Sequence, residues 1–221
     1  MGECVLTKPR VLRYKDLDRD FKVNDHGFWD RVEDGAWETA AIEKLLGIVK
    51  DTDIIFDVGA WIGVYTLLLS HLAKSVVAFE PCPFSRQILI ENLALNDIHN
   101  VAVESHALSD QESEEKIYYY NPTKLDNMLA SSMLNMVDRG ESRSGLSIAT
   151  TTIDAYCERN QIRPDGIKID VEGYEAKVLR GCKVNCWKLV ELHGSFAESP
   201  QVEGELVDGD WDRGHLFVEA A

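Results

Sequence analysis

The stretch Asp53-Ile-Ile-Phe-Asp-Val-Gly-Ala-Trp-Ile-Gly63 decides the fold of this chain. Its first part is apolar apart from two aspartates, which is typical of a strand buried on both faces of a parallel sheet. Gly59 and Gly63 then permit a tight turn, and the apolar run from Val64 to Ala73 favours a helix. Strand, glycine turn and helix in this order form the opening unit of a doubly wound α/β sheet.

The same alternation continues along the chain. We expect strands at 75–79, 100–104, 166–171 and 188–193, and helices at 84–96, 152–160 and 174–180. Thr152 or Asp154 can cap the second of these helices, and Gly181 is expected to end the third in a left-handed conformation. Residues 116–120 predict a strand on an edge of the sheet. Residues 205–219 predict two short antiparallel strands around an Asp-Gly turn.

Two regions are less regular. Residues 1–50 are expected to form an N-terminal cap of helix and loop, in front of a main domain at 51–221. Residues 121–145 are rich in Ser, Asn, Met, Arg and Gly and are longer than most connections. Two interpretations of that segment stay open, a lid that contacts substrate and an excursion without a task.

Composition and charge exclude several classes of protein. The chain has 221 residues, 45% of them hydrophobic, which is ordinary globular composition. Its 38 acidic against 23 basic residues give a net charge of −15, so neither nucleic acid nor an anionic membrane surface is an expected partner. The apolar run from Val58 to Leu69 is shorter than the roughly 20 residues of a membrane span. Without an apolar signal core at the N-terminus, a cytoplasmic location is expected.

The cysteines predict neither disulfides nor a zinc site. Five of them are scattered along the chain without CxxC pairs. Cys182, Cys186 and His193 could supply part of a zinc site, but no further ligand has recognisable spacing.

The turn after the first strand can approach a ligand closely. A dinucleotide fingerprint would need glycine at positions 61 and 64, where this chain has Trp61 and Val64. Glu80 ends the next strand, where an acidic side chain can accept hydrogen bonds from both hydroxyls of a ribose. The pattern therefore predicts a ribonucleoside ligand and disfavours a nicotinamide cofactor.

Together these residues resemble the FkbM-type S-adenosylmethionine-dependent methyltransferases, with a match from about residue 37 to 193. The similar blocks are Asp57–Thr66, Phe79–Pro81, Ala107–Asp110, Thr152–Asp154, Ile167–Glu175 and Val178–Gly181. The resemblance implies a class I, Rossmann-like fold: a doubly wound, mostly parallel seven-stranded sheet with an antiparallel C-terminal strand. It also implies O-methylation of a hydroxyl on a small molecule such as a sugar or polyketide.

The resemblance also implies a cofactor site. Asp57 would lie near the methionine moiety of S-adenosylmethionine, Glu80 would hold the ribose, and Asp170 would face the sulfonium. The remaining contacts would come from Gly59, Ala60 and Gly63 (backbone), Thr66 (hydroxyl), and Ser105, His106 and Ala107 (adenine). Trp61 departs from the asparagine expected at its position, which leaves the methionine end of the pocket undefined.

Candidates for proton removal from the acceptor hydroxyl are Asp170, Glu172 and His193. We expect the two carboxylates to position the acceptor and His193 to act as the base, because its ordinary pKa lies nearest neutrality. Alternatively, Glu172 matches the charge of a helix N-terminus and His193 is a surface residue. A divalent metal held by Asp170, Glu191 and His193 is the second choice, and no metal is expected.

Two other functions stay open. A cofactor-binding protein of the same fold with a decayed acceptor site would bind S-adenosylmethionine without turnover. A nucleotide-sugar or nicotinamide enzyme is less favoured, because two of three fingerprint glycines are missing. The sequence does not set the oligomeric state.

Overall fold

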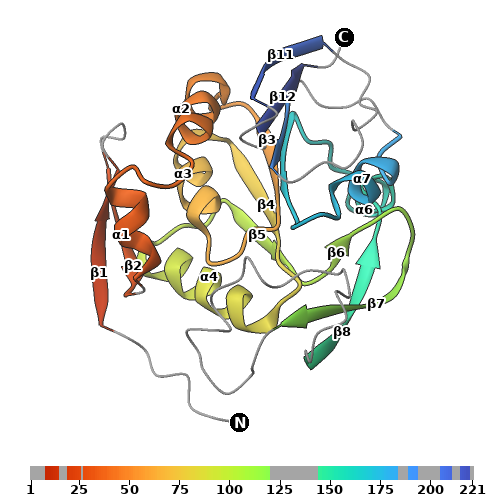
Figure 1. Cartoon of the computed structure of the whole chain (residues 1–221), viewed down its shortest axis with the longest axis horizontal. Coiled ribbons are helices and arrows are strands. Elements are labelled where there is room, and N and C mark those ends of the chain that lie inside the picture. The colour runs from red at the N-terminus through yellow and green to blue at the C-terminus, as the bar shows by residue number, and fades with distance from the viewer. Residues whose placement is uncertain are drawn as a thin grey trace.

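The computed structural model describes residues 8–14, 19–25, 27–119, 144–183, 189–193, 205–210 and 215–219. Its centre is a seven-stranded sheet in the order β11-β12-β10-β9-β3-β4-β5 (Figure 1). The strands are β3 (Ile54–Val58), β4 (Ser75–Phe79), β5 (Val101–Glu104), β9 (Gly166–Asp170), β10 (Leu189–His193), β11 (Glu205–Asp210) and β12 (His215–Glu219). Neighbours from β5 to β10 are parallel, and β12 is antiparallel to β10 and β11. The prediction of a mostly parallel α/β sheet is confirmed.

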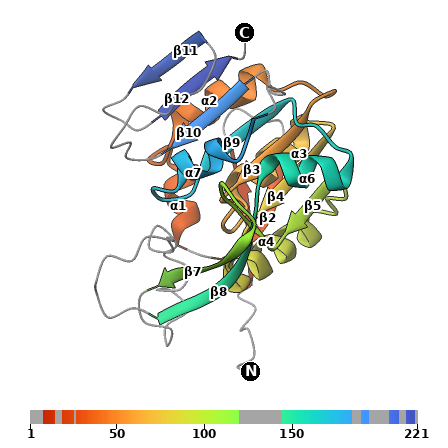
Figure 2. The same ribbon diagram turned by 90° about the vertical axis from the view of Figure 1, so that its right-hand side faces the viewer.

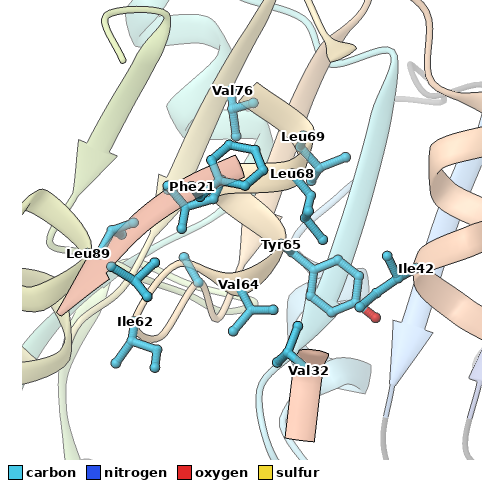
Figure 3. Close-up of a cluster of buried hydrophobic side chains, with 14 of the residues drawn as sticks. Phe21, Val32, Ile42, Ile62, Val64, Tyr65, Leu68, Leu69, Val76 and Leu89 are labelled. Carbon is cyan, nitrogen blue, oxygen red and sulfur yellow. The ribbon is translucent and has the colours of Figure 1, made fainter. Parts of the chain in front are cut away.

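Helices cover both faces of this sheet (Figure 2). They are α1 (Phe28–Glu33), α2 (Thr39–Ile48), α3 (Val64–Leu72), α4 (Pro83–Leu95), α6 (Ile153–Asn160) and α7 (Glu175–Arg180). On one face, Ile55 and Val76 pack with residues of α2, α3 and α4. Figure 3 shows Val76 within this cluster. On the other face, Phe56 and Val77 pack with residues of α6 and α7. The period-2 alternation along each buried strand therefore feeds two separate cores.

The N-terminal region contains strands as well as helices, so the expectation of helix and loop alone was wrong. β1 (Pro9–Arg13) pairs antiparallel with β2 (Asp20–Asn24). The side chains of Phe21 and Trp29 are fully buried and belong to the same core as α3 and α4. Each strand has only five residues, and their short alternation was too weak a signal to separate from loop.

A second sheet lies beside the main one. β6 (Ala107–Leu108), β7 (Ser113–Tyr119) and β8 (Ser144–Thr151) form it in the order β6-β8-β7. The prediction that residues 116–120 form an edge of the main sheet was therefore wrong, because β7 pairs with β8 and β5 is the edge. Most of the segment 121–145 lies outside the described residues, and its end, Ser144 and Gly145, belongs to β8.

Local signals near the helix ends had mixed outcomes. The Thr152 hydroxyl accepts a hydrogen bond from the Ala155 N–H at 3.0 Å, which confirms the cap. Gly181 has φ −80°, so its predicted left-handed conformation was wrong. Glycine is required there for another reason: a Cβ would lie 2.0 Å from the carbonyl oxygen of Ser109. Asp208 and Gly209, predicted as a turn, lie within β11 after a register shift.

Candidate active site

The strand order reverses between β3 and β9, which makes this edge of the sheet the candidate ligand site. Along the chain, β3, β4 and β5 are added in one direction, and β9 and β10 are added on the opposite side of β3. At such a reversal, the loops that leave two neighbouring strands diverge and open a crevice at their carboxyl ends. Here those loops are residues 59–63 and 171–174. Both predicted clusters, the glycine turn and the acidic pair, follow these strands.

The turn from Gly59 to Gly63 depends on backbone that only glycine readily supplies. Gly59 and Gly63 have φ of 79° and 97°, in the region that disfavours side chains. A Cβ on Gly59 would lie 1.8 Å from the carbonyl oxygen of Asp170, so the turn packs directly on the end of β9. The N–H groups of Gly59 and Ala60 both donate to the Phe79 carbonyl, at 3.0 and 3.1 Å. These two donors hold the turn against β4.

Asp57 and Thr66 lie beneath this turn, and both side chains are fully buried. The Thr66 hydroxyl donates to Asp57 Oδ2 at 2.6 Å. Lys168 of β9 lies opposite Asp57 in register, with its Nζ 3.2 Å from Asp57 Oδ1 and 3.0 Å from the Gly59 carbonyl oxygen. The structure therefore brings Asp57 and Thr66 together with each other and with Lys168, as a support below the turn.

Glu80 follows β4 and is buried, with 7% of its surface exposed. Its Oε2 accepts from the Trp61 N–H and its Oε1 from the Cys82 N–H, each at 2.8 Å. Burial raises the pKa of this carboxyl to about 7, although the two N–H bonds oppose the shift. Each carboxylate oxygen can accept a second hydrogen bond, so Glu80 can both fix the turn and bind a ribose.

Ser105, His106 and Ala107 follow β5, on the side of Glu80 away from β3. Ser105 is exposed, His106 is partly buried and Ala107 is buried. Glu104, the last residue of β5, accepts a hydrogen bond from the Tyr156 hydroxyl at 3.0 Å and lies 3.9 Å from His106 Nδ1. Burial is the main reason that the pKa of Tyr156 is raised, so its hydroxyl stays protonated.

Asp170 and Glu172 come at the end of β9, and both are partly buried. Glu172 has φ 56° and Gly173 φ 99°, so the chain turns sharply here. The buried carboxylate of Glu175 closes the turn by accepting from the N–H groups of Val171 and Gly173, at 3.1 and 3.0 Å. Burial raises the pKa of Glu175. Glu172 thus lies in the turn before α7, and the sequence did not identify Glu175 as its support.

His193 ends β10, and its Cα is the register partner of the Cα of Asp170. The backbone thus brings the three candidate catalytic residues to one edge of the sheet. The side chains of Glu191 and His193 lie outside the described ones, so the arrangement of the proposed base stays a prediction. Among the described residues, no group of three or more His, Cys, Asp or Glu side chains could hold a metal ion.

The sequence interpretation missed two residues of this edge. Lys168 lies in an apolar strand where its neighbours Ile167 and Ile169 are buried, and a lysine in such a strand signals a buried partner. Trp61 was noted only as a departure, yet its backbone is left-handed, with φ 52°. Lys168 contacts the glycine turn through the carbonyl oxygen of Gly59, and Trp61 is itself a residue of that turn.

The family model for the methyltransferase FkbM domain matches residues 57–209 of this sequence. This chain belongs to the FkbM methyltransferase family. The match begins at Asp57 and contains the glycine turn, Glu80 and the Asp170 to Glu175 segment.

Individual relatives are more distant. The chain is 29% identical to 31-O-demethyl-FK506 methyltransferase FkbM of Streptomyces tacrolimicus, over 78% of this chain and 75% of that protein. It is 28% identical to the hexuronic acid methyltransferase AglP of Haloferax volcanii, over 74% of this chain and 65% of that protein. The chain thus spans slightly less than two thirds of AglP.

The fold also matches a solved structure. For yhhF of Escherichia coli, a candidate methyltransferase, the TM-score is 0.53 at 15% identity, over 92% of this chain and 93% of that one. This similarity shows the α/β fold alone. In the part of the chain that the structure describes, every helix is too short or too polar to span a membrane.

Proposed function

We propose that this chain is an S-adenosylmethionine-dependent O-methyltransferase acting on a hydroxyl of a small molecule such as a sugar or polyketide. The observation that carries the proposal is the pairing of a glycine turn with the buried acid Glu80 at the strand-order reversal. Membership of a methyltransferase family supports it. The two relatives described above are named for hexuronic acid and for 31-O-demethyl-FK506 as acceptors.

The residues at the edge fit a charged nucleoside. Gly59 and Gly63 leave the turn without side chains at two positions, and Glu80 keeps acceptor sites for two ribose hydroxyls. Ser105, His106 and Ala107 would border the adenine, next to Glu80. The acidic residue Asp170 would face the sulfonium. In this assignment Asp57 and Thr66 support the turn indirectly: Thr66 bonds to Asp57, and Asp57 pairs with Lys168, which donates to the Gly59 carbonyl oxygen.

When bound, S-adenosylmethionine supplies a methyl group on a positively charged sulfur, which leaves as a neutral thioether. The chain then has two tasks, alignment of the acceptor oxygen with the methyl carbon and removal of the hydroxyl proton. We assign alignment to Asp170 and Glu172 and proton removal to His193, whose register partner is Asp170. The net charge of −15 favours a small or neutral acceptor over nucleic acid.

A binding titration followed by a turnover assay tests the proposal. Wild-type protein should bind S-adenosylmethionine by calorimetry, and Glu80→Ala should weaken binding at least tenfold, because hydrogen bonds to charged groups contribute about 1.5–3 kcal/mol each. Glu158→Ala, an exposed acid of α6, is the matched control and should bind like wild type. Unchanged affinity in Glu80→Ala would refute the ribose assignment.

Turnover separates the enzyme from a binding protein with a decayed acceptor site. The protein should transfer labelled methyl groups to at least one member of a library of hydroxylated sugars and polyketides. His193→Ala should slow this transfer while leaving cofactor affinity near the wild-type value. Binding of S-adenosylmethionine without transfer to any acceptor would favour the decayed site.

A further inference from the structure

Trp61 has an unfavourable backbone conformation that the rest of the turn maintains. Its φ of 52° lies in the left-handed region, which glycine and asparagine adopt readily and bulky residues rarely do. The Trp61 N–H donates to Glu80 Oε2 at 2.8 Å, and this bond to a buried carboxylate holds the backbone in place. Conformations of this kind persist only where the surrounding structure maintains them, and they cluster at functional sites.

The position of the indole is fixed by aromatic neighbours from the N-terminal region. The rings of Trp61 and Phe28 meet edge to face, with centroids 4.5 Å apart. Phe28 in turn contacts the ring of Trp37 in the same manner, at 5.1 Å. Such contacts orient a ring without covering it completely, and Trp61 is only partly buried. The N-terminal region therefore positions one side chain of the glycine turn.

Trp61 packs at the margin of the core that α2, α3 and α4 share, and it carries the one side chain of the turn 59–63 that is not buried. Gly59 and Gly63 have no side chain, and Ala60 and Ile62 are buried, with 4% and 1% of their surfaces exposed. The partly exposed positions of the turn are therefore Gly59, which offers backbone to a ligand, and Trp61, which offers an indole. An aromatic face attracts a weakly hydrated cation, and a methylated sulfonium is such a cation.

We propose that the indole of Trp61 packs against the sulfonium end of the methyl donor and distinguishes this cation from the neutral thioether product. The inference rests on the proposed use of S-adenosylmethionine. In this role the strained residue contacts the methyl donor more favourably than the product, because the positive charge is lost when the methyl group is transferred. The product S-adenosylhomocysteine then binds more weakly and leaves the site more readily.

Calorimetric titration with S-adenosylmethionine and with S-adenosylhomocysteine tests the inference without turnover. Trp61→Asn removes the ring and supplies a residue suited to the left-handed backbone, so the variant should fold. It should bind S-adenosylmethionine about tenfold more weakly, with S-adenosylhomocysteine changed less than twofold. Trp61→Phe keeps an aromatic face and should retain most of the preference for the cation. Phe84→Leu, which removes a 42% exposed ring of α4 outside this aromatic cluster, is the matched control and should keep the wild-type ratio of affinities.

The outcomes separate this inference from the function on which it rests. Equal weakening of both ligands in Trp61→Asn, or no change in either, would overturn the role of the indole while leaving the methyltransferase proposal intact. Wild-type protein that binds neither ligand would overturn both. Trp61→Leu, which keeps apolar bulk without an aromatic face, should behave like Trp61→Asn, and a wild-type ratio in the leucine variant would also contradict the inference.

Discussion

Asp57 and Glu80 are both buried at the ends of neighbouring strands, but their charges are balanced differently. Asp57 has the ammonium of Lys168 at 3.2 Å, so two opposite charges share one desolvated site. Glu80 receives N–H bonds from Trp61 and Cys82, and its pKa is raised to about 7 because burial outweighs them. The charge of Asp57 is therefore balanced by Lys168, whereas the charge of Glu80 changes with pH near neutrality.

Glu80 should make the folded chain less stable as pH rises from about 4.5 to 7. Its pKa is about 7 in the folded chain against an ordinary 4.5, so the folded state keeps a proton that the unfolded state has lost. Stability then falls with pH across this window, by about 3 kcal/mol at most. Glu80→Gln cannot titrate and should lack this component. Urea unfolding at pH 5 and 7.5 measures this component: the free energy of unfolding of Glu80→Gln, relative to that of wild type, should increase from pH 5 to pH 7.5.

The exposed acid Glu158 provides the control for that measurement. Glu158→Gln should follow the wild-type dependence on pH. Parallel stability curves for Glu80→Gln and wild type would show that Glu80 has an ordinary pKa in the folded chain.

Lys168→Met should destabilise the protein strongly, because the variant leaves the carboxylate of Asp57 buried without its cation. Loss of one partner of a buried ion pair costs about 3–5 kcal/mol. The double variant Asp57→Asn with Lys168→Met removes both charges and should recover part of this loss. Urea unfolding of wild type, Asp57→Asn, Lys168→Met and the double variant measures the coupling, and Lys74→Met, at an exposed lysine, should stay within about 0.5 kcal/mol of wild type. Additive effects of the two substitutions would contradict the pairing.

At the scale of elements, two glycines, one within a helix and one just after a helix, should respond oppositely to alanine. At Gly181, after α7, a Cβ would lie 2.0 Å from the carbonyl oxygen of Ser109, a backbone atom that cannot rotate away as a flexible side chain would. Gly181→Ala should therefore destabilise the protein by roughly 2 kcal/mol or more, since α7 must move. At Gly47, within α2, a Cβ would meet nothing within 4 Å. Gly47→Ala should stabilise by about 0.5–1 kcal/mol, because alanine loses less backbone freedom.

Thermal unfolding of both glycine variants tests this contrast directly. A neutral Gly181→Ala would mean that the contact between α7 and the segment after β6 yields easily.

Elements with strong local signals were predictable from the sequence, and elements defined by distant pairing were not. The run around Phe56 and the glycine turn after it specify strand and helix within a few residues, and the Thr152 cap is equally local. β7 has the pattern of a strand, but its partner β8 is separated from it by residues 120–143, so the pattern could not say which sheet it joins.

The same distinction applies to the site. Glu80 and Asp170 could be predicted as site residues because their places follow from strand ends and from the family resemblance. Lys168 was missed as a partner of Asp57, because that pair exists only through the register of β3 with β9. The left-handed backbone of Trp61 depends on Glu80, whose bond to it crosses from one strand end to the next.

At the scale of the whole molecule, the N-terminal strands and the main sheet share one core. Phe21 of β2 lies among side chains of α3 and α4 (Figure 3). The backbone of β2 is bonded to α4 as well, since Asn92 Oδ1 accepts from the Asn24 N–H at 2.8 Å. Asn92 also donates to the Ile62 carbonyl at 2.9 Å, so one amide joins β2, α4 and the glycine turn. Loss of the N-terminal packing should therefore also disturb the glycine turn of the candidate site.

Phe21→Ala should lower the stability of the entire chain and not of its N-terminal part alone. Phe21 is fully buried, and its truncation leaves a cavity that costs about 3–5 kcal/mol. Because the core is shared, unfolding in guanidinium should remain one transition, with coincident midpoints by far-UV circular dichroism and tryptophan fluorescence. Phe84→Ala, at a phenylalanine 42% exposed, is the matched control and should change stability by less than about 0.5 kcal/mol. Two separated transitions in Phe21→Ala would instead show that residues 8–48 unfold as a unit of their own.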